Sequence, residues 1–356
     1  MEKKKNIIFT IIALVVLFGG ACVAQFALDA YLRRVANLCM IYAIIGLSLQ
    51  IVNGFCGQFS LGQAGFMAIG AYVVGVFTVP VELRAKVFYA VPMNPLIADI
   101  QMPVWLALIV GGLLAALVAF LIGFPVLRLH GDYLAIATLG FSEIIRIVIT
   151  NAQSFTNGAL GIKDIPPLND ARYIFVVCAL TYLFVTALIN SSYGRAFKAI
   201  REDEIAAEAM GIDLFKHKCM AFMFSAFFAG VGGGLYGALL GTVDPKNFLF
   251  TLTYNFVLII VLGGMGSITG SMLGAILVTG GLEFLRVFDE PLEIFCMAIP
   301  LFRPGFRMVI FSILLMVCVL FWRKGIMGTE EFSWEKFMKF IKNPVGYWKG
   351  DEHCGR

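Results

Sequence analysis

Residues 53–65 read NGFCGQFSLGQAG, a glycine-rich polar stretch between two long apolar runs centred on Ile45 and Ala71. Non-helical backbone at membrane depth is tolerated only where it is buried in protein or lines a wet cavity. Two interpretations are therefore open: a broken segment that lines a substrate path, as in transporters with discontinuous helices, or a short polar turn on the cytoplasmic side. In the first interpretation, the residues predicted to line the path or its gate are Gln58, Ser60, Gly62, Gln63 and Gly65.

The apolar runs beside this stretch are typical of the whole chain. Of its 356 residues, 60% are hydrophobic and 14% are charged, whereas an ordinary soluble domain is about 45–50% apolar and about 25% charged. A water-soluble core cannot bury this much apolar surface, so lipid must be the solvent for much of it. The sequence therefore predicts an all-α fold, a polytopic bundle of transmembrane helices in which several helices are broken by glycine.

Charge, cysteine content and missing motifs exclude other classes of protein. The net charge of +4 is small and dispersed, without the basic stripe that binds nucleic acid. The eight cysteines are scattered singly and only three histidines are present, so neither a disulfide framework nor a metal site is predicted. The sequence shows no paired catalytic carboxylates, no H-E-x-x-H, no G-x-S-x-G and no ATP-binding G-x-x-x-x-G-K-[ST] loop. An enzyme is therefore not predicted.

Hydropathy predicts about ten spans of roughly 17–24 residues, the length that a bilayer requires. Their centres are Val15, Ile45, Ala71, Leu114, Phe141, Leu180, Phe228, Leu258, Ala275 and Leu314. The first span is interpreted as a retained helix from Ile7 to about Leu28, against the alternative of a signal peptide. Retention is favoured because the distribution of basic residues requires that helix.

Lys and Arg fall on the segments assigned to the cytoplasm about twice as often as on the outer loops, which favours both termini in the cytoplasm. Residues 1–326 are predicted to form the transmembrane domain, with a long charged loop over residues 191–218. In the tail, residues 327–356, aromatic residues alternate with lysines. This composition is typical of an interfacial helix and equally of a solvated cytoplasmic tail.

Two further segments repeat glycine every four residues. In the first, Gly233, Gly237 and Gly241 share one helix face. A face without side chains lets a second helix approach closely, so we expect helix packing there, with a moving gate as the alternative. The same expectation holds for a second set of glycines, which consists of Gly266, Gly270 and Gly274.

Ionisable and polar groups inside the predicted spans are few. Glu143 and Arg146 lie three residues apart in the fifth span, so they share a helix face and can pair. Charges inside a membrane are costly and face a cavity or a partner. The pair is therefore either structural or in contact with substrate. Outside the first stretch, the residues predicted to line the path are Thr138, Glu143 and Asn255.

The charged loop contains a run from Tyr193 to Asp213 that is rich in helix-forming residues and in both signs of charge. It predicts a helical stretch that ends near Gly211, a residue suited to a helix C-cap. A polar helix at this place is either a rigid lever that docks in a groove of a soluble partner or an ordinary solvated surface helix.

Three motifs give the chain a family resemblance. Residues 57–72 read GQFSLGQAGFMAIGAY, residues 130–146 read HGDYLAIATLGFSEIIR, and residues 194–211 read GRAFKAIREDEIAAEAMG. Together they resemble the permease subunits of branched-chain amino-acid ABC importers, and the second motif is similar to the LivM-like rather than the LivH-like subunit. The resemblance covers roughly residues 35–325. It implies that the loop couples to an ATPase through Gly194, Arg195, Arg201, Glu202, Asp203, Glu204, Ala207 and Gly211.

The resemblance also implies partners. These are a second, LivH-like permease, two cytoplasmic ATPase subunits and an external or periplasmic substrate-binding protein, in the cytoplasmic (inner) membrane of a bacterium or archaeon. ATP would be bound by the partner subunits, and we expect no cofactor in this chain. The implied substrates are leucine, isoleucine and valine. Import of urea or small amides, and an ion-coupled secondary transporter, are the alternatives.

Overall fold

The computed structural model of the chain describes residues 29–129 and 131–285, and separate positions outside them: 19–20, 22, 25, 293–294, 297–298, 309, 311–313, 316, 320 and 325–328. The two long ranges are helical, as predicted, apart from loops and an isolated β-bridge between Ile162 and Val243. Further on, β1 (Glu293–Ile294) and β2 (Met297–Ala298) form a short antiparallel pair. The predicted first span, the span centred on Leu314 and the tail lie outside the described residues, apart from single positions.

Eight helices form the body of the described part. Five segments are long and apolar enough to cross a bilayer: α2 (Ala30–Leu49) with the π-helix η1 (Gln50–Phe55), α6 (Val104–Val126), α7 (Asp132–Asn151), α9 (Ala171–Asn190) and α12 (Leu214–Leu240). Three are shorter: α3 (Gln63–Thr78), α13 (Phe250–Gly263) and α14 (Ile268–Phe284). The small elements are α4 (Val81–Val87), α5 (Pro95–Ala98), α8 (Gln153–Thr156), α10 (Ser192–Glu202), α11 (Glu204–Ala209), η2 (Gly158–Leu160) and η3 (Pro245–Phe248).

The helices agree with the predicted spans in place but not always in length. Eight of the ten predicted centres, from Ile45 to Ala275, fall on these eight helices. However, α3 has 16 residues, about 24 Å at 1.5 Å per residue, and the chain bends by 118° between it and α4. Helices α13 and α14 have 14 and 17 residues. By length and composition alone, the described residues thus hold five spanning helices, or six if α3 and α4 count as one.

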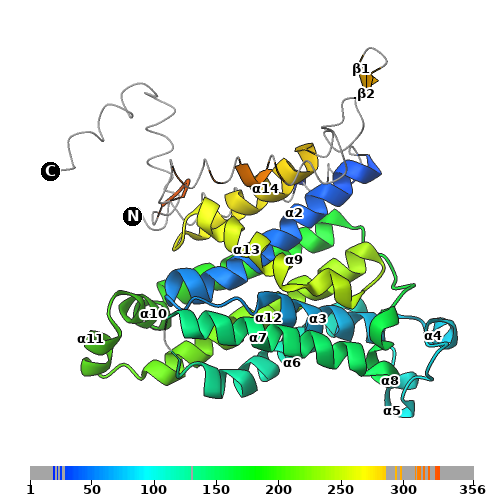
Figure 1. Ribbon diagram of the computed structural model, residues 1–356, viewed down its shortest axis with the longest axis horizontal. Helices are drawn as coiled ribbons and strands as arrows, with labels where there is room; N and C mark the ends of the chain where they lie inside the picture. The colour runs from blue at the N-terminus through cyan, green and yellow to red at the C-terminus, as the bar shows by residue number, and fades with distance from the viewer. Residues whose placement is uncertain are drawn as a thin grey trace.

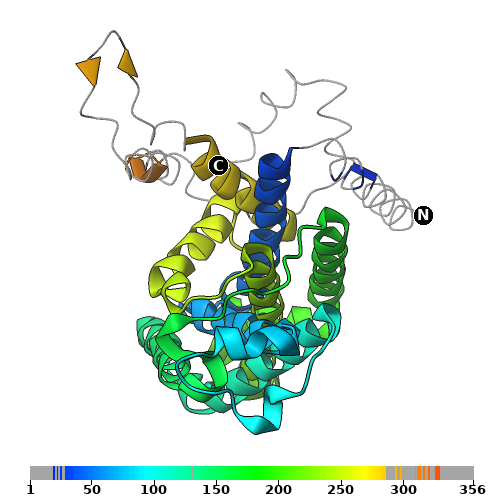
Figure 2. The same ribbon diagram turned by 90° about the vertical axis from the view of Figure 1, so that its right-hand side faces the viewer.

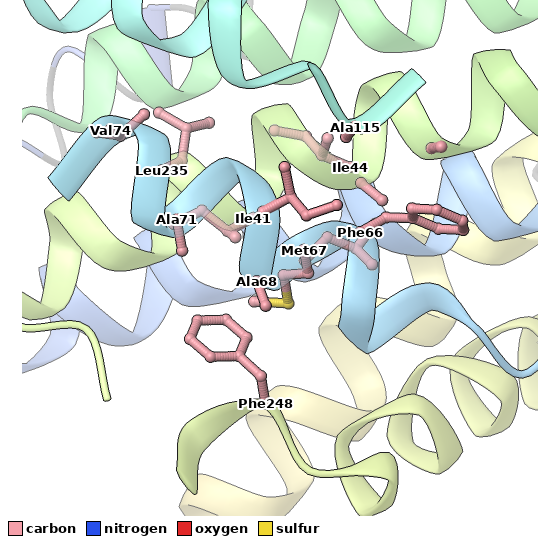
Figure 3. Packing of buried hydrophobic residues seen from close by; sticks show 14 of the residues in the cluster. Ile41, Ile44, Phe66, Met67, Ala68, Ala71, Val74, Ala115, Leu235 and Phe248 are labelled. Carbon is pink, nitrogen blue, oxygen red and sulfur yellow. The ribbon is translucent and has the colours of Figure 1, made fainter. Parts of the chain in front are cut away.

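Helix α3 lies in the centre of the bundle. Fifteen of its 16 residues are buried, and it packs against α12, α6 and α7. Figure 3 shows Met67 and Ala71 of α3 among Ile41 of α2, Leu235 of α12 and Phe248 of η3. A helix that is apolar all round is one that other helices cover on every side. The break before α3 therefore leads into the interior of the molecule.

The connecting loops gather at two opposite ends of the long axis. Helices α10 and α11 lie at one end, and α4, α5 and α8 lie at the other (Figure 1). Figure 2 looks along this axis onto the second end. Hydrogen bonds join the loops there: Asn94 N donates to Ser154 O at 3.0 Å, and Ile162 and Val243 exchange two bonds of 2.8 Å. The long helices therefore run to and fro between the two ends.

Candidate functional site

The chain leaves α2 through a π-helical turn. In η1 the backbone hydrogen bonds join residues five positions apart, where an α-helix joins residues four apart. An example is the bond from Cys56 N to Ile51 O at 3.1 Å. Gly57 then has a φ of 73°, a left-handed conformation that glycine adopts readily. Asn53 holds the non-helical segment that follows, because its Nδ2 donates to Ser60 O at 3.3 Å and its Oδ1 accepts from Ser60 N at 3.1 Å. The predicted break is thus an ordered structure.

Hydroxyl groups of two other helices hold the start of α3. Its N-cap position is Gly62, which has no side chain to cap the helix. Instead, Thr138 Oγ1 of α7 accepts from Leu61 N at 2.9 Å, and Thr253 Oγ1 of α13 accepts from Ala64 N at 3.1 Å. The first N–H groups of a helix have no intrahelical partner. Ala64 N is such a group, and its bond holds α13 against the first turn of α3. Leu61 N lies one residue before the N-cap, and its bond holds α7 at the same place.

Gln63 extends this polar contact to two more helices. Its Nε2 donates to Ser48 Oγ of α2, and its Oε1 accepts from Ser225 Oγ of α12 at 3.4 Å. All three side chains are buried. Buried amides are stable when hydrogen-bonded and costly when not. These bonds therefore keep α2, α3 and α12 in a fixed arrangement around the break.

Glycines at the start of α3 permit the close approach of α7. A Cβ on Gly62 would lie 3.2 Å from Thr138 O, and a Cβ on Gly65 would lie 2.9 Å from Ser142 Cα. Gln58 is only 4% exposed, and neither of its amide atoms has a hydrogen-bond partner among the described residues. The same is true of Ser142 Oγ. Unpaired buried polar atoms are rare in proteins and often mark functional positions.

The predicted path residues fall into two groups. Those that lie around the break are Gln58, Ser60, Gly62, Gln63, Gly65 and Thr138. Glu143, farther along α7, accepts from Arg146 Nε at 2.7 Å and from Phe250 N at 3.4 Å, so it ties α7 to the start of α13 as a structural pair does. Asn255 is half-buried on α13, two residues after Thr253. Among residues 53–65, Gly57 and Phe59 are exposed, whereas the others are buried or half-buried.

Sequence analysis missed three residues of this site. Asn53 bonds Ser60 across the non-helical segment, Thr253 caps α3, and Ser142 lies against the first turn of α3. A single hydroxyl in an apolar helix commonly bonds a carbonyl of its own helix, as Thr138 Oγ1 also does to Ala135 O at 3.0 Å. No spacing in one sequence therefore distinguishes the hydroxyls that reach a second helix.

The first glycine set lies where α12 meets its neighbours. A Cβ on Gly233 would overlap the backbone carbonyl of Met67 in α3, and a Cβ on Gly237 would lie 2.7 Å from Val243 Cγ2. Gly241 differs from the prediction. It is the C-cap of α12 with a φ of 70°, so its role is to end the helix in a left-handed turn.

The second glycine set joins α13 and α14 into a hairpin. A Cβ on Gly270 would overlap the carbonyl of Gly263, and a Cβ on Gly274 would overlap the carbonyl of Ile259. Gly266 again differs from the prediction, because it lies in the turn between the helices with a φ of 100°. A spacing of four residues places glycines on one helix face only within the helix. The sequence alone does not show where the helix ends.

The charged loop folds as two helices, where one helical stretch was predicted. Helix α10 ends at Asp203, whose Oδ1 accepts from Ile205 N and Ala206 N at 2.9 and 3.0 Å and so begins α11. Aspartate is a preferred N-cap residue because its carboxylate satisfies these free N–H groups. Gly211 ends the pair near the predicted place, with a φ of 82°.

Two charged residues of the loop point into the protein. Arg201 Nη1 donates to the carbonyl of Gly54 in η1 at 2.9 Å, and its Nη2 donates to Glu202 at 2.7 Å. Glu204 accepts from Lys218 Nζ of α12 at 2.6 Å. Because Lys218 is only 5% exposed, its ammonium group needs such a partner. The loop is therefore bonded to both α2–η1 and α12.

Of the remaining predicted coupling residues, some are buried against the helix bundle and others are exposed. Gly194 lies where a Cβ would overlap the backbone of Ile189, so α10 starts tightly against the end of α9. Ala207 is buried, whereas Arg195 is exposed and donates to Ser192 Oγ at 2.9 Å. The most exposed apolar side chains of the loop are Ile205 (82%) and Met210 (83%).

Comparison with known proteins identifies the family. The family model described as branched-chain amino acid transport system / permease component matches residues 31–319. This chain belongs to that family. Its relatives include the high-affinity branched-chain amino acid transport system permease protein LivM of Escherichia coli K12. That protein is 36% identical over 290 residues, which cover 72% of this chain and 64% of LivM. The predicted resemblance to LivM-like permeases is confirmed.

Two other relatives are more distant. The LivH permease protein of the same E. coli system is 25% identical over 263 residues, or 66% of this chain and 79% of LivH. The guanosine ABC transporter permease protein NupQ of Bacillus subtilis is 25% identical over 303 residues, or 80% of this chain and 88% of NupQ. The match to E. coli LivM spans less than two thirds of that protein. With five helices of bilayer length, family membership makes the chain a multi-pass membrane permease.

Proposed function

We propose that this permease is the LivM-like half of the translocation channel of an ATP-driven importer of branched-chain amino acids. The observation that carries the proposal is the 36% identity to E. coli LivM over 290 residues. In this role the chain is a transport subunit and not an enzyme. It holds no cofactor of its own, because separate ATPase subunits bind and hydrolyse ATP.

The α10–α11 loop is the docking element for an ATPase. Its inner face is fixed to the bundle by the Gly54 and Lys218 contacts, and its outer face presents Ile205 and Met210. Exposed apolar side chains of this size gain free energy when a partner covers them. A loop that is rigid on one side and apolar on the other can pass the movement of a bound partner to the helices.

The break before α3 lines the gated path. Thr253 of α13 holds Ala64 N in the first turn of α3, and Thr138 of α7 holds Leu61 N just before that turn. Separation of α7 and α13 from α3 would free both N–H groups. The free N–H groups at the start of a discontinuous helix bind anionic substrate groups in other transporters. An amino-acid carboxylate is such a group, and the unpaired amide of Gln58 lies in the same buried segment.

The proposal also assigns one side of the membrane to each end of the bundle. Residues 1–326 form a domain of ten spans with both termini in the cytoplasm, and residues 327–356 form a cytoplasmic or interfacial tail. The α10–α11 end faces the cytoplasm, and the α4–α5–α8 end faces the external binding protein (Figure 1). The membrane is the cytoplasmic membrane of a bacterium or archaeon. The second permease is LivH-like, since E. coli LivH is also a relative.

Other substrates and energy sources have less support. Guanosine is the second candidate substrate because NupQ is a relative, but its identity of 25% is well below that of LivM. Neither E. coli LivM nor NupQ is described as a permease for urea or small amides. An ion-coupled mechanism needs a carboxylate that is free to bind an ion, and Glu143 is engaged by Arg146 and Phe250 N.

Purification of the tagged chain in mild detergent tests the assembly. We expect it to retain a second permease and two ATPase subunits. The double variant Ile205→Glu, Met210→Glu should lose the ATPases and keep the second permease, because it removes only the apolar outer face of the loop. The assigned docking element would be contradicted if the unaltered chain retained no ATPase. It would also be contradicted if the double variant retained the ATPases as fully as the unaltered chain.

A further inference from the structure

Arg201 caps the end of the long α2–η1 helix. The last carbonyl groups of a helix have no intrahelical partner, and Gly54 O, one of these, accepts from Arg201 Nη1 at 2.9 Å. Gly57 permits this approach, since a Cβ there would lie 2.7 Å from Arg201 Cγ and 3.1 Å from its Cα. The positive φ of Gly57 turns the chain away at the same point. Arg201 can therefore reach Gly54 O because position 57 carries no side chain.

Further contacts fix α10 to η1 around this bond. Lys198 Nζ lies 5.7 Å from the ring centroid of Phe55, within the range of a cation–π contact. Phe55, Phe197 and Ile200 are buried in the same apolar cluster. Positive charge is also favourable at a helix C-terminus, where the partial charge of the backbone is negative. The end of η1 and the inner face of α10 are therefore packed as one unit.

The same π-helix is bonded to the interior of the permease. At its start, Gln50 Nε2 donates to Gly264 O at 3.0 Å and to Ser267 O at 3.2 Å, both in the turn between α13 and α14. Near its end, Asn53 holds Ser60 in the break before α3. π-Helical turns inside α-helices occur frequently at functional sites. A displacement of η1 would therefore reach both the break and the α13–α14 turn.

We propose that Arg201 is a positioning residue that acts inside the permease. Through Gly54 it transmits the movement of the α10–α11 loop to η1, and through η1 to the break before α3 and the α13–α14 turn. Arg201 is thus not a docking contact for the ATPase, although its place in the loop motif suggests one. This inference rests on the proposed function, because it needs an ATPase that moves the loop.

Reconstituted complexes with ATPases, binding protein and leucine test the inference, using Arg201→Gln. This variant should retain the ATPase subunits and hydrolyse ATP, but import at least about tenfold less leucine per ATP, since a charge-assisted hydrogen bond is lost. Arg201→Lys, which keeps a charged donor, should restore part of the ratio. The matched control is Arg128→Gln, an exposed arginine after α6 whose guanidinium lies over the Phe124 ring; because it lies outside the α10–α11 loop, this variant should leave the ratio unchanged. Loss of the ATPases from Arg201→Gln, or an unchanged ratio, would overturn the inference.

A distance measurement checks the link without altering Arg201. Spin labels at Tyr193→Cys on α10 and Phe59→Cys after η1, both exposed positions, are placed in a background without native cysteines. Their separation should stay the same between nucleotide-free and ATP-trapped complexes to within about 1–2 Å, an ordinary helix shift. A larger change would show that the loop moves independently of η1. If the unaltered complex binds no ATPase or imports no leucine, the proposed function fails, and not this link alone.

Discussion

At the scale of single residues, glycine decides how closely the central helices approach. Gly233 of α12 lies directly against the Met67 carbonyl of α3, and Gly70 of α3 lies against the backbone of Gly230. No side chain fits between the two backbones at these points. Small residues at helix contacts are the usual means of close packing in membranes, where no hydrophobic effect drives the helices together.

Replacement of Gly233 by Ala is expected to destabilise the protein by about 1–3 kcal/mol, the usual cost of overpacking. The added Cβ overlaps backbone, which cannot move aside as a flexible side chain can. The midpoint of thermal unfolding in detergent measures the effect. The matched control is Gly280→Ala on α14, where a Cβ would meet nothing within 4 Å. Equal midpoints for the two variants would contradict the packing role of Gly233.

The spacing of glycines predicted this contact only in part. Gly233 and Gly237 lie on the packed face, whereas Gly241 is the helix cap. A glycine can serve either as a packing position or as a helix cap. Which of these it does depends on where the helix ends. The polar residues behave similarly: the apolar context of Gln63 marked it as a candidate, but its partners Ser48 and Ser225 depend on the tertiary arrangement.

At the scale of elements, a single arginine organises the segment of residues 79–103. Arg84 is 4% exposed, and its Nε donates to Val79 O at 3.2 Å. Its two terminal nitrogens donate to the carbonyls of Ile97, Ala98 and Ile100 at 2.8, 2.6 and 2.7 Å. The planar guanidinium group suits this role because it presents five donors in fixed directions. Arg84 thus joins α4 and α5 at the end of the bundle opposite α10.

Replacement of Arg84 by Ala should loosen residues 79–103 without unfolding the long helices. It leaves four carbonyls without their donor, at a cost of about 1–3 kcal/mol for each that water does not reach. Amide hydrogen exchange should rise in this segment and stay unchanged in α6 and α12. Arg84→Lys should be intermediate, because an ammonium group cannot reach all four carbonyls. Unchanged exchange in residues 79–103 of the alanine variant would show that Arg84 does not hold the segment.

The positions of the helices could be predicted from the sequence, but some of their ends and contacts could not. The apolar runs located eight described helices, because hydropathy reflects burial in lipid or protein directly. The short length of α3 and the bonds from Thr138 and Thr253 that hold its start were not predictable. They arise from contacts between residues more than 70 positions apart, and no local propensity records such contacts. The division of the charged loop at Asp203 has a local signal, since aspartate before Glu-Ile-Ala is a preferred N-cap.

At the scale of the whole molecule, the proposed function gives the two ends of the bundle different roles. One end carries the α10–α11 loop, which is bonded through Arg201 and Lys218 to α2–η1 and α12. The other end carries the α4–α5 segment and its partner loops (Figure 2). Between them, α3 begins at the break near the first end and runs toward the second. An ATPase at one end can therefore influence a path that opens toward the other.

The central claim is that this permease moves branched-chain amino acids at the expense of ATP. Its most direct test is uptake of labelled leucine into proteoliposomes that hold this chain, its second permease and the ATPases, with ATP inside and binding protein outside. We expect leucine to accumulate only with ATP, to persist when ionophores abolish ion gradients, and to be reduced by isoleucine and valine but not by guanosine or urea. Leucine uptake driven by an ion gradient without ATP, or accumulation of guanosine in its place, would contradict the account.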